Sequence, residues 1–581
     1  MMASFSTRRT FFALIATLAF GLASATAQDA RRAYVPPALD TVHAIPAEHG
    51  MVVAQEKISA QVGADILRRG GNAVDAAVAT GFAMAVTYPR AGNIGGGGFM
   101  VIHSTERNED IAIDYRETAP AATTAQIFLG TDGKPDPAKS RDSGLGIGVP
   151  GTVAGLALAH EKYGSGKFTL AQLIAPAITL AREGFTVDDD LADTLPRAAP
   201  RLARWPATAK IFLKPDGKPF ADGERLIQND LADSLQAIAT GGPRAFYEGP
   251  LAEKLVAAIR QNGGIITAGD LKSYRAIERP PVRGTYRGYD IASMPPPSSG
   301  GTHLIQILNI LEGFPLRESG AGAAATLHLM IEAMKPAYAD RAEYLGDPAF
   351  VKVPAGLTAK SYAAELRKAI DPERARPSQT IRAGTPPQEG DNTTHYSVID
   401  SQGNAVANTY TLNFTYGLGL VAEGTGILLN NELDDFAAKA GAPNAFGLVG
   451  GDANAPGPGK RPLSSMSPTI ALRDGRVFLV AGTPGGSRII TTVLQVVLNV
   501  VDHRMNVAEA VLAPRIHHQW LPDEVNAESG LSPDTIRLLE ARGHKIAVGR
   551  TFGSVNAIMV TPDGLAGSAD PRQRGTLAEG Y

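Results

Sequence analysis

The spacing of apolar positions changes near residue 392, and before that point helical spacing dominates. Residues 58–86 are rich in alanine and interrupted by Gly70-Gly71, which predicts two packed helices. A further helix is predicted at 302–314. Three other stretches predict amphipathic helices that end at or near a glycine: 152–164, 170–184 and 251–264.

Alternating patterns predict strands, mostly in the last third of the chain. Residues 394–413 read as strand, Ser-Gln-Gly-Asn turn and strand, and residues 468–482 repeat this pattern around Asp474-Gly475, a strong hairpin signal. Residues 487–501 then predict a buried helix. Two earlier strands are expected at 99–104 and 111–117. Helices mainly before the change and hairpins after it predict stacked sheets covered by helices.

The first residues predict export. Residues 1–27 contain two arginines, a short apolar run and small residues before Gln28, as in a cleaved secretory signal peptide. Arg8-Arg9 also fits a twin-arginine signal, so either the Sec or the twin-arginine route is open. The apolar run is shorter than the roughly 20 residues of a membrane span, and no later segment is long enough. A periplasmic or secreted protein is expected.

Composition and common motifs exclude several classes of function. The formal net charge of −3 gives no electrostatic case for nucleic acid or for an anionic membrane. The chain has no cysteine, hence no thiol nucleophile. "GIGVPG" at 146–151 lacks a preceding strand, and Pro150 removes a backbone donor, so it does not predict dinucleotide binding. His517 and His518 are adjacent and point apart, which favours structural roles over metal binding.

The strand that begins at Thr393-Thr394 follows a Pro-, Gly- and charge-rich segment, 374–392, which we expect to be exposed and open to cleavage. A threonine hydroxyl is a weak nucleophile that needs a base beside it. If the chain is cut before Thr393, the new α-amino group can serve as that base. An ordinary edge strand that starts on a β-branched residue explains the local pattern equally well, so these residues alone leave both readings open.

Seven sequence blocks resolve this choice by resemblance. The chain resembles the γ-glutamyltranspeptidases, which are N-terminal-nucleophile hydrolases, over essentially its whole mature length. The blocks are "AGNIGGGGFM", "MPPPSSGG", "TTHYSV", "LLNNELDDF", "GLVGGDANAPGPGKRPLSSMSPTI", "GTPGGSRIITTVLQ" and "APRIHHQWLPDE". The resemblance implies an α+β fold, an αββα sandwich built from one precursor. That precursor would be cut into a large subunit, 28–392, and a small subunit, 393–581, which together form a heterodimer.

The resemblance also implies roles for individual residues. Asn392 and Thr393 flank the cleavage site, Thr393 becomes the nucleophile, and the hydroxyl of Thr411 supports it. The backbone amides of Gly485 and Gly486 would hold an oxyanion, a task suited to fixed N–H groups before a helix. The substrate's α-carboxylate would be bound by Arg116, Ser464 and Ser465. Its α-ammonium would be bound by Asn413, Glu432 and Asp435.

The implied activity is a γ-glutamyltransferase that also hydrolyses glutathione and passes the γ-glutamyl group to water, amino acids or peptides. No metal or organic cofactor is implied. Two departures from the family pattern concern Asn392, which bears on the rate of processing, and Phe446, which replaces a tyrosine of several bacterial relatives in the expected lid. The alternatives are a cephalosporin acylase of the same superfamily, which takes a glutaryl group, and a non-enzymatic periplasmic binding protein.

Overall fold

The computed structural model describes residues 42–381 and 393–581. The expected signal peptide, 1–27, and Asn392 lie outside the described residues. The chain separates into a segment that ends at His43 and one compact unit, Ala44–Tyr581, and all that follows concerns this unit. Among the described residues, no helix has both the length and the hydrophobicity needed to cross a bilayer.

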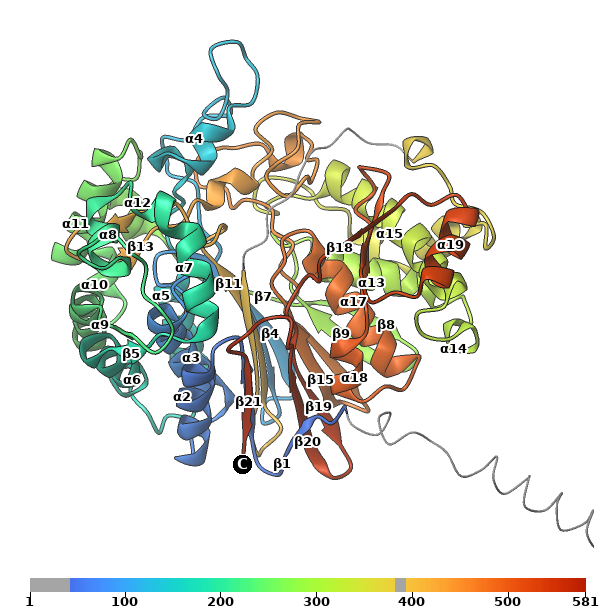
Figure 1. The fold of residues 1–581 in the computed structure, drawn as a ribbon, viewed down its shortest axis with the longest axis horizontal. Coiled ribbons are helices and arrows are strands. Elements are labelled where there is room, and N and C mark those ends of the chain that lie inside the picture. The colour runs from blue at the N-terminus through green and yellow to red at the C-terminus, as the bar shows by residue number, and fades with distance from the viewer. Residues whose placement is uncertain (1–41, 382–392) are drawn as a thin grey trace, which may run out of the picture. The chain divides into compact units, whose positions relative to one another are not determined.

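Two seven-stranded sheets form the centre of the unit (Figure 1). The first has the order β1 (Ile45–Ala47), β20 (Gly564–Ala569), β19 (Asn556–Thr561), β15 (Arg476–Gly482), β14 (Thr469–Arg473), β9 (Tyr289–Ser293), β8 (Val282–Tyr286). The second has the order β21 (Leu577–Gly580), β2 (Met51–Ala54), β10 (Thr394–Ile399), β11 (Ala405–Thr411), β3 (Gly97–Ser104), β4 (Glu109–Asp114), β7 (Ile277–Arg279).

The alternation of side chains along the strands divides the core into layers. In β2, Met51 and Val53 belong to a cluster between the sheets that also contains Ile470 and Val480 of the other sheet. Val52 and Ala54, the alternate residues of β2, pack instead against helices. Since successive strand residues point to opposite faces, each sheet is apolar on both sides.

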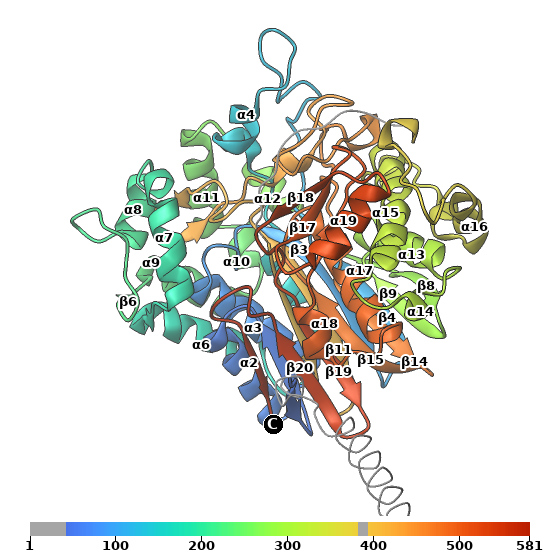
Figure 2. The ribbon, with the colours of Figure 1, turned by 45° about the vertical axis from the view of Figure 1, so that its right-hand side comes forward.

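Two groups of helices cover the outer faces of the sheets, on opposite sides in Figures 1 and 2. Those packed on the second sheet include α2 (Lys57–Arg68), α3 (Ala73–Thr87), α5 (Thr152–Tyr163), α6 (Leu170–Glu183), α7 (Asp189–Leu202), α8 (Pro206–Phe212), α9 (Asn229–Gly241), α10 (Arg244–Tyr247), α11 (Pro250–Gln261) and α12 (Ala268–Ser273). Those on the first sheet include α13 (Gly300–Leu311), α14 (Leu316–Ser319), α15 (Ala324–Tyr344), α16 (Lys360–Lys368), α17 (Arg488–Val501), α18 (Val507–Leu512) and α19 (Pro533–Ala541). The predicted αββα sandwich is confirmed.

Smaller elements lie outside these layers. Helix α4 (Pro137–Arg141) is short, and the remaining strands pair as β5 (Phe185–Thr186) with β6 (Arg225–Leu226), β12 (Val421–Ala422) with β13 (Ile427–Leu428), and β16 (Ile516–His517) with β17 (Val525–Glu528) and β18 (Ile546–Gly549). The predicted hairpin at Asp474-Gly475 is β14–β15, with φ of 53° and 74° at the two turn residues, as a tight hairpin turn requires.

The segments before and after residue 392 share both sheets. The hairpin β10–β11 lies between β2 and β3, and β14 pairs with β9. The part before the predicted cut therefore supplies strands to each sheet in addition to most of the helices. Neither part forms a complete sheet alone.

The expected exposure of segment 374–392 is wrong for part of its described portion. Ser378 is fully buried, its hydroxyl donates to Asp523, and the Trp520 indole donates to the Ser378 and Ile381 carbonyls. Lys335 donates to the Arg376 carbonyl. Because buried backbone groups need partners, these bonds fix the segment up to residue 381. Residues 382–392 lie outside the described structure.

Candidate active site

The hairpin β10–β11 brings the two predicted threonines together. Thr394 pairs with Tyr410 in the antiparallel register, so the next position places Thr393 opposite Thr411. The amide of Asn413 donates to Thr411 Oγ1 at 2.8 Å, and the Asn93 side chain donates to the Thr411 carbonyl at 2.8 Å. These bonds fix the Thr411 hydroxyl at the end of the strand, beside Thr393.

One pocket collects the predicted site residues that the structure describes, except Gly485. Its lining comes from segments far apart in the sequence: Arg116, Arg341, Thr393, Thr411, Asn413, Glu432, Asp435, Phe446, Leu448, Ser464, Ser465, Met466, Gly486 and Ile489. Gly485 lines an adjoining hollow that also contains Thr393. Asn392 lies outside the described residues. The cavity is only about 20 Å³, so its own side chains nearly fill it.

A buried charge cluster occupies one wall of this pocket. The guanidinium of Arg116, with no exposed surface, donates to Glu432 through Nη1 and to Asp435 through Nη2. Burial raises the pKa of both carboxyl groups, and the charge of Arg116 opposes that rise. Burial also lowers the pKa of Arg116, but the two carboxylates outweigh this and raise it above its ordinary value.

Glu117 adds a third carboxyl group to the cluster and is not part of the pocket lining. Its Oε2 lies 4.0 Å from Arg116 Nη1, and neither carboxyl oxygen has a hydrogen-bond partner among the described residues. Burial raises the pKa of Glu117 to about 7, with Arg116 acting in the opposite direction. On the pocket wall itself, the two carboxyl groups of Glu432 and Asp435 outnumber the guanidinium of Arg116, so the wall suits a ligand that carries a positive charge.

Next to Arg116, whose Nε donates to the Pro462 carbonyl at 3.1 Å, the pocket lining is built from two loops that bind each other. The Ser464 amide donates to the Pro297 carbonyl at 2.9 Å, and the Ser299 amide donates back to the Ser464 carbonyl at 2.8 Å. The "MPPPSSGG" and "PLSSMSP" segments thus fix one another, and both Ser464 and Ser465 line the pocket. A hydroxyl pair beside a guanidinium can bind a carboxylate.

Arg341 is a site residue that sequence reasoning missed. It is buried in the last turn of α15, where Nε donates to Ser299 Oγ at 2.9 Å and Nη2 donates to Ser465 Oγ at 3.3 Å. A basic residue near a helix C-terminus is ordinary, so the sequence carries no signal for this role. The side chain adds a second guanidinium to the wall formed by the serines.

The glycine pair before α17 has a backbone that suits anion binding. The φ angles of Gly485 and Gly486 are 135° and 53°, which favour glycine. Among the residues described, neither amide donates a hydrogen bond to another protein group. Unpartnered N–H groups at the start of a helix form a ready oxyanion site.

The loop around Phe446 packs against Gly486. A Cβ atom added at Gly486 would lie 2.5 Å from Phe446 Cδ1. The Phe446 ring packs edge-on against Phe414, with centroids 6.1 Å apart. Asn444 accepts from the Phe446 amide at 2.9 Å and donates to Asp435 at 3.4 Å. Ring packing and Asn444 thus hold the loop in place without a hydroxyl at position 446.

One group of described residues has the composition of a metal site, namely His328, Glu332 and His544. His328 Nδ1 and His544 Nε2 are 2.7 Å apart, the length of a hydrogen bond, and Lys335 already pairs with Glu332 at 2.7 Å. The hydrogen bond between the two imidazoles, the bond of His328 Nε2 with the Asp371 carbonyl and the pairing of Glu332 with Lys335 explain this arrangement. His517 bonds to Thr491 and Gln519, and His518 to Asp523, in accord with the structural roles expected for them.

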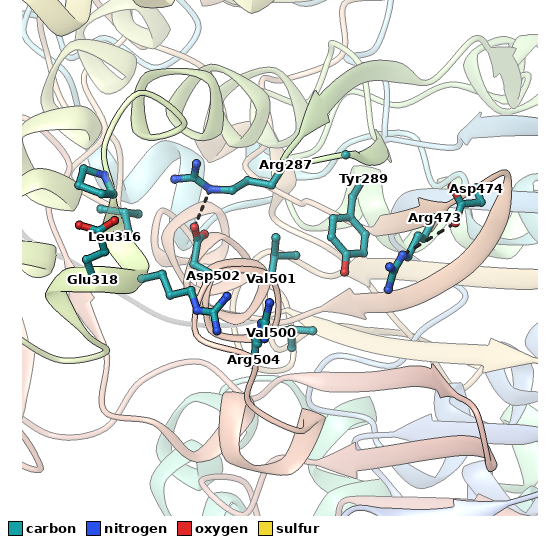
Figure 3. A pocket seen from close by; sticks show the side chains of 13 residues that line it. Arg287, Tyr289, Leu316, Glu318, Arg473, Asp474, Val500, Val501, Asp502 and Arg504 are labelled. Atoms are coloured by element: carbon teal, nitrogen blue, oxygen red, sulfur yellow. Dashed lines mark hydrogen bonds and ion pairs between the residues drawn. The ribbon is translucent and has the colours of Figure 1, made fainter.

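Another hollow, of about 910 Å³, lies apart from all predicted site residues. Figure 3 shows that Arg287 points to Asp502 within it, at 2.7 Å. Arg317 and Arg504 also line it and are exposed. Its size alone does not make it a site, because it is an open surface groove without a nucleophile or an unpartnered buried group.

The chain is similar to known proteins over most of its length. The gamma-glutamyltranspeptidase family profile matches residues 59–580. The glutathione hydrolase proenzyme of Escherichia coli K12 is 55% identical over 545 residues, 93% of each chain. A cephalosporin acylase from Bacillus halodurans superposes with a TM-score of 0.80 at 30% identity, over 93% of this chain and 97% of that one. A Helicobacter pylori gamma-glutamyltranspeptidase chain gives 0.55 at 47% identity, over 56% and 93%. The chain belongs to the gamma-glutamyltranspeptidase family.

Proposed function

We propose that the protein is a γ-glutamyltransferase that cleaves the γ-glutamyl amide of glutathione and related compounds. The observation that supports this best is the pocket that joins Thr393 to a zwitterion-binding lining. The ligand's α-carboxylate would meet Arg116, Ser464 and Ser465. Its α-ammonium would meet Asn413, Glu432 and Asp435. Each charge of the head group thereby gains a partner of opposite sign.

The reaction follows from the groups around Thr393. Its hydroxyl oxygen attacks the γ-carbonyl carbon while its own α-amino group takes the hydroxyl proton. The oxyanion is held by the Gly485 and Gly486 amides. The proton then passes to the amide nitrogen, the C–N bond breaks, and the amine leaves a γ-glutamyl ester on Thr393. Water or an acceptor amine attacks the carbonyl carbon of this ester and gives a proton to the α-amino group. The bond between that carbon and Thr393 Oγ1 breaks, the α-amino group passes the proton to Oγ1, and glutamate or the γ-glutamyl acceptor leaves.

This mechanism requires a free α-amino group on Thr393, so the precursor must be cut between Asn392 and Thr393. Residues 28–392 and 393–581 would remain together as a heterodimer. Strand pairing would connect them, because both sheets contain strands from each part. The expected signal peptide would deliver the precursor to the periplasm or the exterior.

The second candidate is a glutaryl-cephalosporin acylase, favoured by the structural likeness to the Bacillus halodurans enzyme. A glutaryl group has no ammonium, so it would leave the buried carboxylates of Glu432 and Asp435 without a ligand charge to face. Identity of 55% to a glutathione hydrolase proenzyme also favours the γ-glutamyl donor. Family membership makes the non-enzymatic binding protein wrong.

The test is release of nitroaniline from γ-glutamyl-p-nitroanilide, measured with and without a dipeptide acceptor. We expect release in both cases and a γ-glutamyl dipeptide only when the acceptor is present. Denaturing electrophoresis of the same sample should show two chains. A sample that contains both chains and hydrolyses glutaryl anilide in preference to the γ-glutamyl one would contradict the proposal.

A further inference from the structure

Thr393 lies between two cavities of different character. One is the small donor pocket; the other is an adjoining hollow of about 800 Å³ that Thr393 also lines, together with Gly485 and Thr415. If the donor pocket holds the γ-glutamyl group, the other half of the amide extends away from it, across the carbonyl carbon. The hollow is thus placed to receive the departing amine. Attack by the acceptor amine is the reverse of the departure of the first amine, so the acceptor must approach from the same side.

One face of α7 lines this hollow. The residues recur at intervals of three or four, so they form a single stripe along the helix. They are Asp190, Asp193, Thr194, Arg197, Ala198 and Arg201. The adjoining face carries Leu191, Leu195 and Leu202 into the core. Core packing therefore fixes which side of α7 faces Thr393.

The hollow is rich in arginine, and most of its arginines have acidic partners. Arg90 pairs with Asp190 at 3.2 Å, and Arg197 pairs with Asp193. Two more arginines of the lining pair with acidic residues that do not line the hollow: Arg572 with Glu528 at 2.7 Å and Arg574 with Asp189 at 3.8 Å. These pairs account for every guanidinium of the lining except that of Arg201.

Arg201 has no carboxylate within ion-pair distance among the described residues. Its Nη2 donates to the Thr415 carbonyl instead. The side chain is half-buried, and Thr415 belongs to the loop that also carries Asn413 into the donor pocket. A partly desolvated guanidinium whose charge is not paired, in a cavity that Thr393 lines, can bind an anionic group of the incoming or departing amine.

We propose that this hollow is the subsite for the amine half of the reaction, and that Arg201 binds the C-terminal carboxylate of the departing or acceptor peptide. The inference rests on the proposed function. The substrate class is an α-amino acid or short peptide with a free carboxylate. An amide of the same peptide lacks the charge and should be a poorer acceptor.

The experiment compares glycylglycine with glycylglycinamide as acceptors, with γ-glutamyl-p-nitroanilide as the donor. The wild type should have a kcat/KM about tenfold or more higher for glycylglycine, as expected when a charge-assisted hydrogen bond is lost. In Arg201→Gln this ratio should fall to near one. Arg201→Lys keeps the charge without the forked geometry and should give an intermediate ratio.

Arg204→Gln is the matched control. Arg204 stands three residues beyond Arg201, pairs with Asp142 at 3.6 Å, has a side chain that is 61% exposed, and is not part of the lining. The Arg204→Gln variant loses the same charge as Arg201→Gln and should keep the wild-type ratio of kcat/KM for glycylglycine to that for glycylglycinamide. A wild type that uses both acceptors equally would overturn the proposal, and so would an equal drop in both control and test variants. Absence of nitroaniline release from the wild type would instead contradict the proposed function itself.

Discussion

The Nη2 atom of Arg116 lies 2.5 Å from Oδ2 of Asp435, and both side chains line the pocket that contains Thr393. The two protein charges to which we assign the substrate's α-carboxylate and α-ammonium, those of Arg116 and Asp435, thus pair with each other. A zwitterionic ligand can replace this internal ion pair with two new ones: its carboxylate pairs with the guanidinium of Arg116, and its ammonium pairs with the carboxylate of Asp435. A ligand with one charge cannot, because one protein charge then stays buried and less well paired.

Arg116→Lys tests the carboxylate half of this exchange. Lysine keeps the charge but not the forked geometry that holds two oxygens. We expect KM for γ-glutamyl-p-nitroanilide to rise about tenfold or more, since a hydrogen bond to a charged group contributes about 1.5–3 kcal/mol. Processing into two chains should be intact. An unchanged KM in steady-state kinetics would remove Arg116 from the substrate site.

Thr393→Ala and Thr393→Ser test whether one hydroxyl serves both cleavage and catalysis. Cleavage before residue 393 by an N→O acyl shift needs a hydroxyl on that residue. The alanine variant should therefore remain a single inactive chain, whereas the serine variant should still form two chains, more slowly. Electrophoresis over a time course measures both. Normal maturation of the alanine variant would show that another group performs the cleavage.

The sequence predicted the hairpin that carries Thr393 and Thr411 because its register depends on local signals. The Ser-Gln-Gly-Asn turn folds β11 back on β10, and alternation fixes which face is buried. Asp474-Gly475 predicted β14–β15 for the same reason. The local pattern was sufficient to predict strand pairing in these two hairpins, because the paired strands are close in the chain.

Local patterns do not predict contacts between residues that are distant in the chain. The insertion of β10–β11 between β2 and β3 depends on pairing with strands that precede residue 105. Family resemblance named Arg116 and Asp435 as site residues, but their ion pair follows only from the fold. Arg341 shows the same limit, because its hydrogen bond to Ser465 joins the end of a helix to a distant loop.

Glu117→Gln tests the pH dependence of stability. The folded state holds the Glu117 proton up to a pKa of about 7, above the ordinary value of 4.5. Between these values the unfolded chain releases a proton that the folded chain keeps, so wild-type stability falls as pH rises through this window. Glutamine cannot ionise and avoids this loss. Calorimetry should show Tm of the variant rising relative to wild type from about pH 4.5 to 7.5; parallel curves would contradict the raised pKa.

Gly486→Ala tests the packing of the Phe446 loop against Gly486. The new Cβ would meet Phe446 Cδ1 at 2.5 Å, and alanine is also strained at a φ of 53°. We expect kcat/KM to fall about tenfold or more. Adding Phe446→Ala removes the ring and should restore part of the loss, which a double-mutant cycle measures. Equal loss with and without Phe446 would assign the effect to the backbone alone.

Asp435→Asn tests which donor the pocket is built for. A γ-glutamyl donor brings an ammonium to Asp435, and a glutaryl donor has only a methylene there. The charged carboxylate therefore favours the first donor and, left without a ligand charge beside it, disfavours the second.

We expect the wild type to prefer γ-glutamyl over glutaryl anilide and the variant to narrow that gap from both sides. The γ-glutamyl rate should fall about tenfold or more while glutaryl turnover holds or rises, because asparagine removes an attraction for one donor and a penalty for the other. The measurement is kcat/KM for each of the two anilides, made on the same preparation of each enzyme. Equal fractional losses would make Asp435 a structural residue, and a wild type that prefers the glutaryl amide would favour the acylase.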